Sequence, residues 1–323
     1  MKHVFCVLSL LVCFCCCATS SSCTSRKSKI RVVSWNVQTF FDGVTDGTEY
    51  AQFKGASSRW TERKYRTRLE RLSTALCTFD ADIVVLEELE KQEQLYDIYN
   101  QLSGSFHVAR NYTYGAFAKA DGSAIGCGVL SRYPLTKATV HALDIGTERT
   151  PEPALRPLLE VGITCKTGQT ERVLTLFVCH WKSKLGADSA VWRRWQERVL
   201  NERMTRAVHA GGAALCCGDY NQDIFEFDTA DSCVLLAGRA PLAVYSPWLD
   251  DACFSDGSYW YKGEWERIDH FFAAGVFLTD FCADSAGSWA DEAGRPIRYD
   301  LLSGEGYSDH LPIRCAVSFG DEY

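Results

Sequence analysis

Amide, carboxylate and imidazole side chains recur at the points where strand-like runs of this chain end. They occur in the segments SWN, LEELE, CHWKSK, GDYNQD, RIDHFF and YSDHLPI, as Asn36, Glu88, His180, Asp219, Asn221, Asp269, Asp309 and His310. One polar residue at a strand end is ordinary, because loops are polar. Six such segments together supply hard oxygen ligands and two histidines, a donor set that suits Mg²⁺ or Mn²⁺ and a phosphate group.

Phosphodiester hydrolysis requires side chains of these types. Displacement at phosphorus gathers negative charge on the oxygens, and a divalent metal neutralises that charge and activates water. Mg²⁺ keeps several waters, so one or two carboxylates suffice, and Glu88 is the leading expected ligand. A histidine backed by a carboxylate can act as a general base or as a cationic phosphate contact. Asn36 and Asn221 can orient groups without adding negative charge beside an anionic substrate.

Layered sheets flanked by helices are expected to position these residues, because strand-like runs outnumber helical ones. The strand-like runs cover residues 30–36, 82–87, 126–132, 158–165, 172–180, 213–219, 267–273 and 311–319. Helices are predicted over residues 61–79, 90–102 and 189–210. The chain shows no repeat or Pro-rich linker after its leader, which predicts a single domain over residues 30–319 and a tail at 320–323.

The two longer predicted helices carry different signals. Residues 61–79 open on Thr61 as a candidate N-cap, and their apolar face is formed by Tyr65, Leu69, Leu72 and Leu76. In residues 189–210 the apolar side chains at roughly helical spacing are Val191, Trp195, Val199 and Met204.

Residues 1–23 are typical of a secretory signal. A positively charged start precedes an apolar run at residues 4–18, too short for a confident membrane span, and small residues follow. Cys23 also permits lipid attachment of the bacterial lipoprotein type, although Ser20 replaces the Leu usually found three residues before such a cysteine. Cleavage and lipidation both stay open, with residues 24–29 as a short linker. The protein is expected to be exported, as a secreted or periplasmic protein or as a membrane-anchored lipoprotein.

The cysteines predict little chemistry. Of sixteen cysteines, ten lie beyond the leader, an even number that permits disulfides without specifying any pairing. No CxxC pair occurs among those ten, so a thioredoxin or zinc-ribbon site has no support. Cys216 and Cys217 lie inside an apolar run just before Asp219 and are expected as small buried residues. Asp223 is expected as a loop or cap residue.

The ordered set of six segments resembles the endonuclease/exonuclease/phosphatase superfamily, which has the DNase I-like fold. The resemblance spans residues 30–319, and the order of the segments makes it specific. It implies a four-layered α/β sandwich of two packed mixed β-sheets flanked by helices. It also implies phosphoester cleavage that depends on a divalent metal, Mg²⁺ or Mn²⁺.

The resemblance also implies roles for single residues. Asn36 matches the Asn that ends the first strand near the metal, and Glu88 matches the metal-binding Glu, with Glu87 where Gln is usual. His180 matches a histidine that contacts the scissile phosphate. The remaining matches are Asp219 and Asn221 to the GDxN pair, Asp269 to the acid of the next strand, and Asp309 to the carboxylate that polarises His310. Asp269 is grouped with Asn36 and Glu88 as an expected metal ligand.

Several features narrow the expected substrate. The CHWKSK segment and SYWYKGEWERIDHFF look like the exported bacterial nuclease-like branch, which predicts hydrolysis of DNA or RNA by an activated water. The Arg-Ile-Asp-His order argues against inositol-polyphosphate phosphatases, and LEELE fits abasic-site endonucleases less well. Sphingomyelinase or other phospholipid phosphodiesterase activity remains an alternative, because the aromatic cluster Trp260, Tyr261 and Trp265 could touch a lipid head group. Packing under a hairpin is favoured for that cluster.

Charge gives limited information about partners. The net charge is −7, or −8 without residues 1–23 because Lys2 is lost, so the whole chain does not attract nucleic acid. Lys182, Lys184 and Arg194 follow the strand that ends on His180 and are expected to contact a substrate backbone. The chain is expected to be monomeric, with the membrane reached only through a lipid on Cys23. A surface-exposed binding protein without turnover is the remaining alternative, disfavoured because every motif position keeps a competent side chain.

Overall fold

The computed structural model describes residues 29–54, 58–105, 112–143, 155–167, 170–228, 244–250, 253 and 255–320. The predicted signal at residues 1–23, its Cys23 and nearly all of the predicted linker lie outside the described residues. Among the residues that are described, no helix has the length and apolar character needed to span a membrane.

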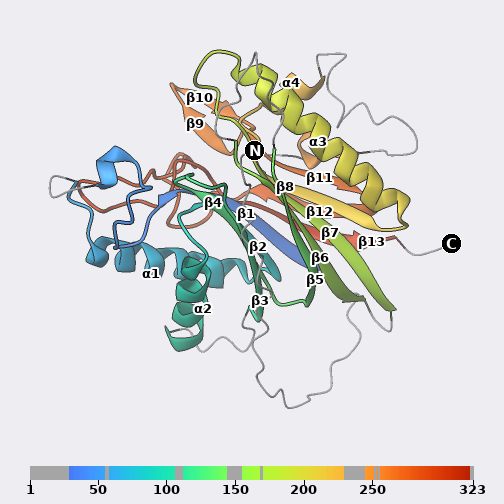
Figure 1. Ribbon diagram of the computed structural model, residues 1–323, viewed down its shortest axis with the longest axis horizontal. Helices are drawn as coiled ribbons and strands as arrows, with labels where there is room; N and C mark the ends of the chain where they lie inside the picture. Colours follow the sequence, from blue (N-terminus) through green and yellow to red (C-terminus); the bar gives the residue numbers. More distant parts are fainter. Residues whose placement is uncertain are drawn as a thin grey trace, which may run out of the picture.

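Two mixed β-sheets pack face to face at the centre of the molecule (Figure 1). The first sheet has the order β12 (Val276–Ala283), β13 (Ile313–Phe319), β1 (Ile30–Phe40), β2 (Ile83–Leu89), β4 (Gly126–Ser131) and β3 (Tyr114–Ala118). The second has the order β11 (Asp269–Ala274), β8 (Ala213–Asp219), β7 (Thr170–His180), β6 (Leu158–Thr167) and β5 (Leu135–His141). The pairs β1–β2 and β7–β8 are parallel, and the other pairs are antiparallel.

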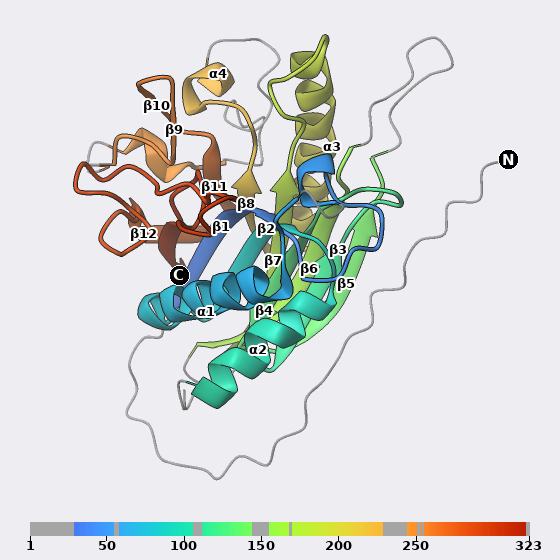
Figure 2. The same ribbon diagram turned by 90° about the vertical axis from the view of Figure 1, so that its left-hand side faces the viewer.

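Helices cover the outer face of each sheet, which completes four layers (Figure 2). Helices α1 (Glu62–Phe79) and α2 (Glu93–Ser105) lie on the first sheet, and α3 (Ser189–His209) lies on β7 and β8. Shorter elements are η1 (Ala51–Phe53), α4 (Ile224–Asp228), η2 (Pro247–Leu249) and the hairpin of β9 (Tyr259–Tyr261) and β10 (Glu264–Glu266). The predicted four-layered sandwich is therefore confirmed.

Helix α1 follows its sequence signals closely. Oγ1 of Thr61 accepts a hydrogen bond from the backbone N–H of Lys64 at 3.3 Å, so the predicted N-cap is present. The predicted apolar face is buried, and the helix ends at Asp80, whose φ of 44° stops it in the left-handed region.

Helix α3 differs from the prediction in the face that it packs. Of the predicted apolar residues Met204 is buried, but Val191 and Trp195 are 45% and 40% exposed, and Trp192 and Leu200 are buried instead. The buried face also carries polar groups, because Oε1 of Gln196 accepts from the backbone N–H of Lys182 at 2.8 Å. Apolar spacing was therefore a poor guide, since part of this face binds the loop after β7 through hydrogen bonds.

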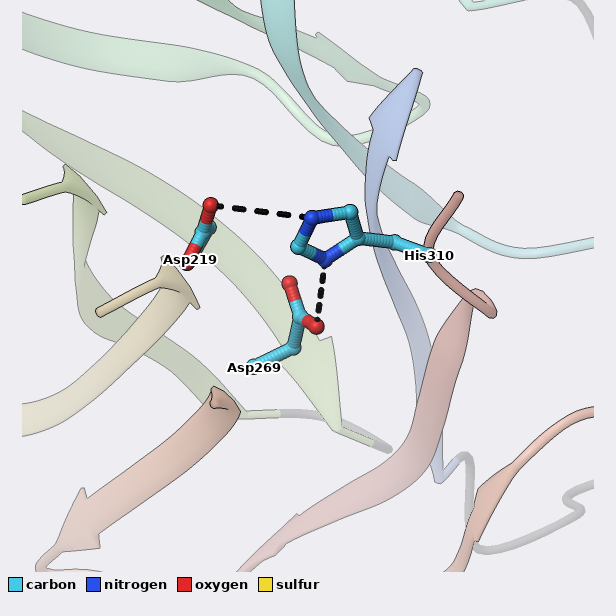
Figure 3. A group of neighbouring side chains, drawn as sticks. All are labelled: Asp219, Asp269 and His310. Carbon is cyan, nitrogen blue, oxygen red and sulfur yellow. Dashed lines mark hydrogen bonds and ion pairs between the residues drawn. The ribbon is translucent and has the colours of Figure 1, made fainter. Parts of the chain in front are cut away.

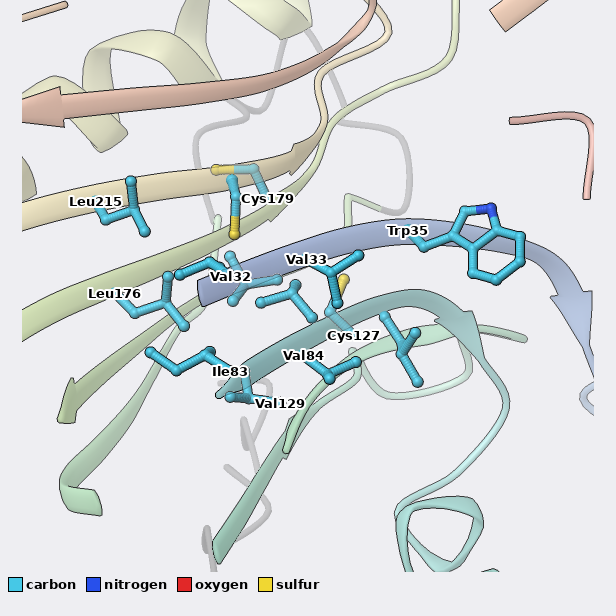
Figure 4. Close-up of a cluster of buried hydrophobic side chains, with 14 of the residues drawn as sticks. Val32, Val33, Trp35, Ile83, Val84, Cys127, Val129, Leu176, Cys179 and Leu215 are labelled. Atoms are coloured by element: carbon cyan, nitrogen blue, oxygen red, sulfur yellow. The ribbon is translucent and has the colours of Figure 1, made fainter. Parts of the chain in front are cut away.

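The space between the sheets is filled by aliphatic side chains and thiols (Figure 4). Every residue of β8 is buried, because the first sheet covers one face and α3 the other. Cys216 and Cys217 are fully buried and carry free thiols, as do the other cysteines of the described residues. Burial raises the pKa of both thiols well above the usual range, so they are inert neutral groups in the core.

Strand pairing brings the predicted site residues to one end of both sheets. In the parallel pair β7–β8, His180 lies opposite Asp219, and in the antiparallel pair β8–β11, Asp269 also lies opposite Asp219. In the first sheet Asn36 lies opposite Glu87. An isolated bridge joins His310 to Tyr259 of β9. Residues far apart in sequence therefore converge through register alone.

Candidate active site

The strand ends surround a cleft with a volume of about 810 Å³. Carboxylate, imidazole, amide, basic and aromatic side chains line it, among them Glu88, His180, Asp219, Asn221, His310, Asp309, Arg156, Arg298, Tyr259 and Tyr299. Six of the eight residues predicted at strand ends line this cleft, and the other two, Asn36 and Asp269, lie buried directly behind it.

Glu88 reaches the cleft because β2 is irregular at this residue. Its backbone has a φ of 69°, and the pairing of β2 with β4 shifts register between Glu87 and Leu89. Oε2 of Glu88 accepts from the backbone N–H of Thr39 at 2.5 Å, and Oε1 accepts from Nδ2 of Asn36 at 3.3 Å. The carboxylate is thus held by two donors and stays partly open to the cleft.

Asn36 links Glu88 to Asp219. Its Nδ2 also donates to Oδ2 of Asp219 at 3.0 Å, so one buried amide joins both carboxylates. Asn221 fixes Asp219 from the other side, with its backbone N–H 2.8 Å from Oδ1 and its Nδ2 3.1 Å from Oδ2. Burial raises the pKa of Asp219 to about 7, against the opposing charge of His310, so this carboxyl gains and loses its proton near neutral pH.

His180 lies between Asp219 and a guanidinium. Its Nε2 is 2.6 Å from Nη2 of Arg156 and 3.5 Å from Oδ2 of Asp219. A guanidinium can only donate, so this nitrogen accepts and the imidazole is neutral. Burial, followed by the charge of Arg156, lowers the pKa of His180 well below its usual value. His180 therefore orients Arg156 at the wall of the cleft.

His310 is paired with a carboxylate other than the one predicted. Its Nδ1 is 2.8 Å from Oδ2 of Asp269, and its Nε2 faces Oδ2 of Asp219 at 4.0 Å (Figure 3). Asp269, and not the predicted Asp309, is therefore the hydrogen-bond partner of His310, because Oδ2 of Asp309 lies 3.9 Å from Nε of Arg298 at the cleft rim and acts on the imidazole through its charge alone. Burial alone would lower the pKa of His310, but the charge and hydrogen bond of Asp269 raise it well above its usual value.

The donors at the cleft floor fit a hard divalent cation. Glu88 and Asp219 converge on one amide, and within the described residues neither carboxylate forms an ion pair with lysine or arginine. Their oxygens are ligand types that Mg²⁺ and Mn²⁺ accept, whereas Oδ1 of Asn36 accepts from the backbone N–H of Gln38 at 3.0 Å, so ligation by Asn36 stays a prediction. Asp269 has one oxygen within 4.8 Å of ligand atoms of Asp219 and His310, but its Oδ2 is bonded to His310. Its role as a metal ligand stays a prediction.

The three basic residues predicted to contact the substrate lie in different surroundings in the structure. Lys184 lines the cleft, although its Nζ pairs with Oε2 of Glu266 at 2.6 Å. Nζ of Lys182 instead donates to the carbonyl oxygen of Leu185 at 2.7 Å, and Arg194 is an exposed residue of α3. Lys182 and Arg194 are not among the residues that line the cleft, because the loop after β7 folds back on itself. A substrate contact by these two residues therefore lacks structural support.

Three residues of this region were not identified as functional from the sequence. Arg156 lies just before β6 with no motif around it, and Tyr259 contacts the imidazole of His310 with ring centroids 4.7 Å apart. Glu87 is fully buried, and its Oε1 accepts from Oγ of Ser34 at 2.8 Å. Burial, then the charge of Asp269, raises the pKa of Glu87 well above its usual range, so the neutral acid resembles a glutamine in hydrogen-bonding capacity.

The aromatic residues of the β9–β10 hairpin have two roles: some pack within the hairpin and others line the cleft. Trp260 and Trp265 are cross-strand partners in the β9–β10 hairpin, with ring centroids 5.2 Å apart, as the packing hypothesis predicted. Tyr259 and Tyr261 line the cleft instead, and their rings are stacked at 5.9 Å. The expected hairpin packing therefore holds for the tryptophans alone.

Comparisons with known proteins agree with this architecture. The model of the endonuclease/exonuclease/phosphatase family matches residues 33–310. Humanized D. rerio TDP2 with 14 mutations superposes with a TM-score of 0.57 at 18% identity, covering 90% of this chain and 99% of that chain. A Bacteroides thetaiotaomicron protein of the family superposes with a TM-score of 0.57 at 15% identity, covering 92% of this chain and 100% of that chain. D. rerio TDP2 complexed with a single-strand DNA product gives a TM-score of 0.55 at 17% identity, with coverages of 90% and 99%. No curated protein sequence matches the chain significantly.

Proposed function

This chain belongs to the endonuclease/exonuclease/phosphatase family, whose members hydrolyse phosphoester bonds, and from that premise we propose that it is a divalent-metal-dependent nuclease. The observation that carries the proposal is the convergence of Glu88, Asp219 and His310 in one cleft, each held by a buried amide or carboxylate partner. A fold retained only for binding would not require these pairings.

The cation is proposed to bind at Glu88, with Asn36 and Asp219 beside it. Bound Mg²⁺ or Mn²⁺ supplies neutralisation of charge on the phosphate and lowers the pKa of a water molecule. The amide of Asn36 keeps the two carboxylates together without adding charge of its own.

The side chains around the phosphate are assigned separate tasks. Asp219, with a pKa of about 7, accepts the proton of the attacking water, because a general base works best near the operating pH. Asn221 keeps the Asp219 carboxylate in one orientation through two hydrogen bonds. His310, protonated through its contact with Asp269, and Arg156, held by His180, bind the anionic phosphate oxygens.

Nucleic acid is the proposed substrate because the cleft combines cations with stacked aromatic rings. Tyr259 and Tyr261 extend the ring of His310 outward along the cleft, and Arg298 lies at the same rim. Bases of a single strand stack on such rings while basic side chains follow the backbone. A structural neighbour, TDP2 of D. rerio, was crystallised with a single-strand DNA product, which supports the same class of substrate.

A panel of phosphoesters tests this proposal. Protein lacking residues 1–23 is incubated with single-stranded DNA, duplex DNA, RNA, sphingomyelin and phosphoinositides, each with Mg²⁺, Mn²⁺ or EDTA. Cleavage of a nucleic acid that EDTA abolishes is expected. Cleavage of lipids alone would replace nuclease by phospholipid phosphodiesterase, and no metal-dependent cleavage of any member would refute an enzymatic function.

Export is proposed from the leader alone. Expression of the full chain in a bacterium, followed by mass spectrometry of the product, is expected to show loss of the leader. Retention of lipid on Cys23, removed by Cys23→Ser, would identify a lipoprotein, and an intact N-terminus in the cytoplasm would contradict export.

A further inference from the structure

A second group of carboxylates lies outside the cleft, where the loop between β1 and η1 meets the residue that follows β2. One oxygen from each of Asp46, Glu49 and Glu90 lies within 4.8 Å of the others. Glu49 is 4% exposed and Glu90 is fully buried, whereas Asp46 is exposed. We refer to these three residues as the loop cluster.

The carboxylate of Glu90 is the group that the fold leaves unsatisfied. Its Oε2 accepts from the backbone N–H of Asp42 at 2.7 Å, but its buried Oε1 has no hydrogen-bond partner in the described part of the chain. A buried carboxylate oxygen without a partner is costly, and a bound ion is one way to satisfy it. One oxygen of Glu90 lies within 4.8 Å of ligand atoms of Asp46 and Glu49.

The positive side chains nearby are directed elsewhere. Nζ of Lys91 pairs with Asp42, Nζ of Lys119 donates to the carbonyl oxygen of Glu90 at 2.8 Å, and Nζ of Lys54 donates to the carbonyl oxygen of Gly47 at 2.5 Å. Across the ranges that the structure describes, no ion pair involves Asp46, Glu49 or Glu90. These carboxylates therefore form no direct ion pair with the described lysines and arginines, and the charges of Lys91 and Lys119 act on Asp46 only from a distance.

Backbone amides hold the loop cluster in a concave arrangement. Oε1 and Oε2 of Glu49 accept from the N–H groups of Asp46 and Gly47 at 2.6 and 2.9 Å. Gly47 has a φ of 99°, a conformation that only glycine adopts readily, and it turns the chain back over Glu49. The acceptors are therefore fixed by the fold before any ligand arrives.

We propose that the loop cluster binds a Ca²⁺ ion that fastens the β1–η1 loop to the end of β2. Ca²⁺ takes six to eight oxygen ligands in irregular geometry, so three carboxylates can be completed by water on the exposed Asp46 side. Mg²⁺ suits this group less well, because it demands a strict octahedron and releases water reluctantly. The ion is structural and does not take part in hydrolysis, since Asp46, Glu49 and Glu90 are not among the residues that line the cleft.

The bound ion would stabilise one wall of the cleft. The loop follows the end of β1, where Gln38 and Thr39 lie, and leads to Gln52 and Phe53 of η1, and all four residues line the cleft. Glu90 also follows Glu88 by two residues, so a cation at the loop cluster fixes the backbone beside the catalytic carboxylate. A modest effect on substrate affinity is expected from its loss.

Calcium binding by the full-length chain carrying Glu88→Gln tests the proposal, because this background weakens cation binding in the cleft. Isothermal titration with Ca²⁺ and luminescence of Tb³⁺ excited through Tyr50 are the readouts, with Mg²⁺ as the competing ion. A single Ca²⁺ per chain is expected, with at least tenfold weaker affinity after a further Asp46→Asn or Glu90→Gln substitution.

Asp291→Asn is the matched control, because Asp291 is also a loop carboxylate that accepts backbone N–H groups. It is expected to leave the affinity unchanged. Asp46→Asn keeps the test valid if Glu90→Gln unfolds, since Asp46 is exposed. No Ca²⁺ binding in the Glu88→Gln background, or equal affinity in the Asp46→Asn variant, would overturn the proposal.

Discussion

Two acidic residues at the end of strand β2, Glu88 within it and Glu90 just after it, belong to different clusters. Glu88 joins Asn36, Asp219 and the histidines at the cleft floor, whereas Glu90 joins Asp46 and Glu49 on the loop outside it. Asp219 and Asp269 lie against the imidazoles of His180 and His310, whereas the loop carboxylates accept from backbone amides and from the hydroxyl of Thr48. A group of neighbouring carboxylates therefore does not identify a reactive site by itself. The side chains that contact the carboxylates distinguish the two sites.

The largest loss of activity is expected from substitution of His310. His310→Ala removes the cation that faces Asp219 and the phosphate, and kcat/KM is expected to fall by about 10³-fold, within the range of a lost acid–base or charge contact. Hydrolysis of the best substrate of the panel measures this loss, and circular dichroism confirms the fold. Turnover within threefold of the native rate would exclude His310 from the reaction.

The two candidate carboxylate partners of His310 offer a matched pair. Asp269→Asn removes the acceptor bonded to Nδ1 and is expected to lower kcat by 10²- to 10⁴-fold, because the imidazole loses its charge and orientation. Asp309→Asn removes a carboxylate that lies near Arg298 and is expected to cost less than about tenfold. Steady-state kinetics of both variants decides between them. Equal losses, or a larger loss for Asp309→Asn, would restore the pairing predicted from the sequence.

Arg156 distinguishes the cleft from the loop cluster, because no arginine contacts the three described carboxylates of the loop cluster. Arg156→Ala is expected to raise KM and to lower kcat/KM by about tenfold to a hundredfold, since one phosphate contact disappears. Arg172→Ala is the control, because its Nη1 donates to the carbonyl of Gly320 far from the cleft lining. If both variants behave alike, Arg156 is a structural residue only.

The protonation of Asp219 is expected to have a smaller effect, on the stabilisation of the protein by Mg²⁺. The folded-state pKa of Asp219 is raised to about 7 from 3.8, so its contribution to stability is full below pH 4 and is lost as pH rises through 7. Mg²⁺ bound at Glu88 would lie beside Asp219 and would compete with that proton through its positive charge. The increase in melting temperature caused by Mg²⁺ is therefore expected to grow between pH 6 and pH 8, as differential scanning fluorimetry can measure. A constant or shrinking increase would place the cation away from Asp219.

Much of the fold was predictable because its inner strands carry dense apolar runs. Strands β1, β2, β4, β6, β7, β8, β11 and β13 all overlap predicted runs, and α1 was predicted with its cap. In the two large sheets β3, β5 and β12 were missed, and each lies at an edge; the short hairpin strands β9 and β10 were missed as well. The edge strand β11 was predicted because all of its residues are buried. An edge strand buries fewer side chains, as the exposed Thr136 and Lys137 of β5 illustrate, and its pattern is correspondingly weak.

The site was predictable as a set of residues but not as a set of contacts. Strand-end positions identified Glu88, His180 and Asp219, because polar residues after buried runs stand out in sequence. Which carboxylate meets His310 depends on the register of β8 with β11, and that register is not encoded near His310. Arg156 and Glu90 acquire their surroundings only through tertiary packing, so no local signal distinguished them.

We assign phosphodiester hydrolysis to the carboxylates and histidines that line the cleft and not to the loop cluster. Metal-dependent cleavage of a single-stranded oligonucleotide, measured side by side for the native chain, Glu88→Gln and Asp46→Asn, tests it most directly. Glu88→Gln is expected to lose at least about 10³-fold in kcat/KM, and Asp46→Asn to stay within about threefold of the native value. Near-native cleavage by Glu88→Gln, or its abolition in Asp46→Asn, would contradict this assignment.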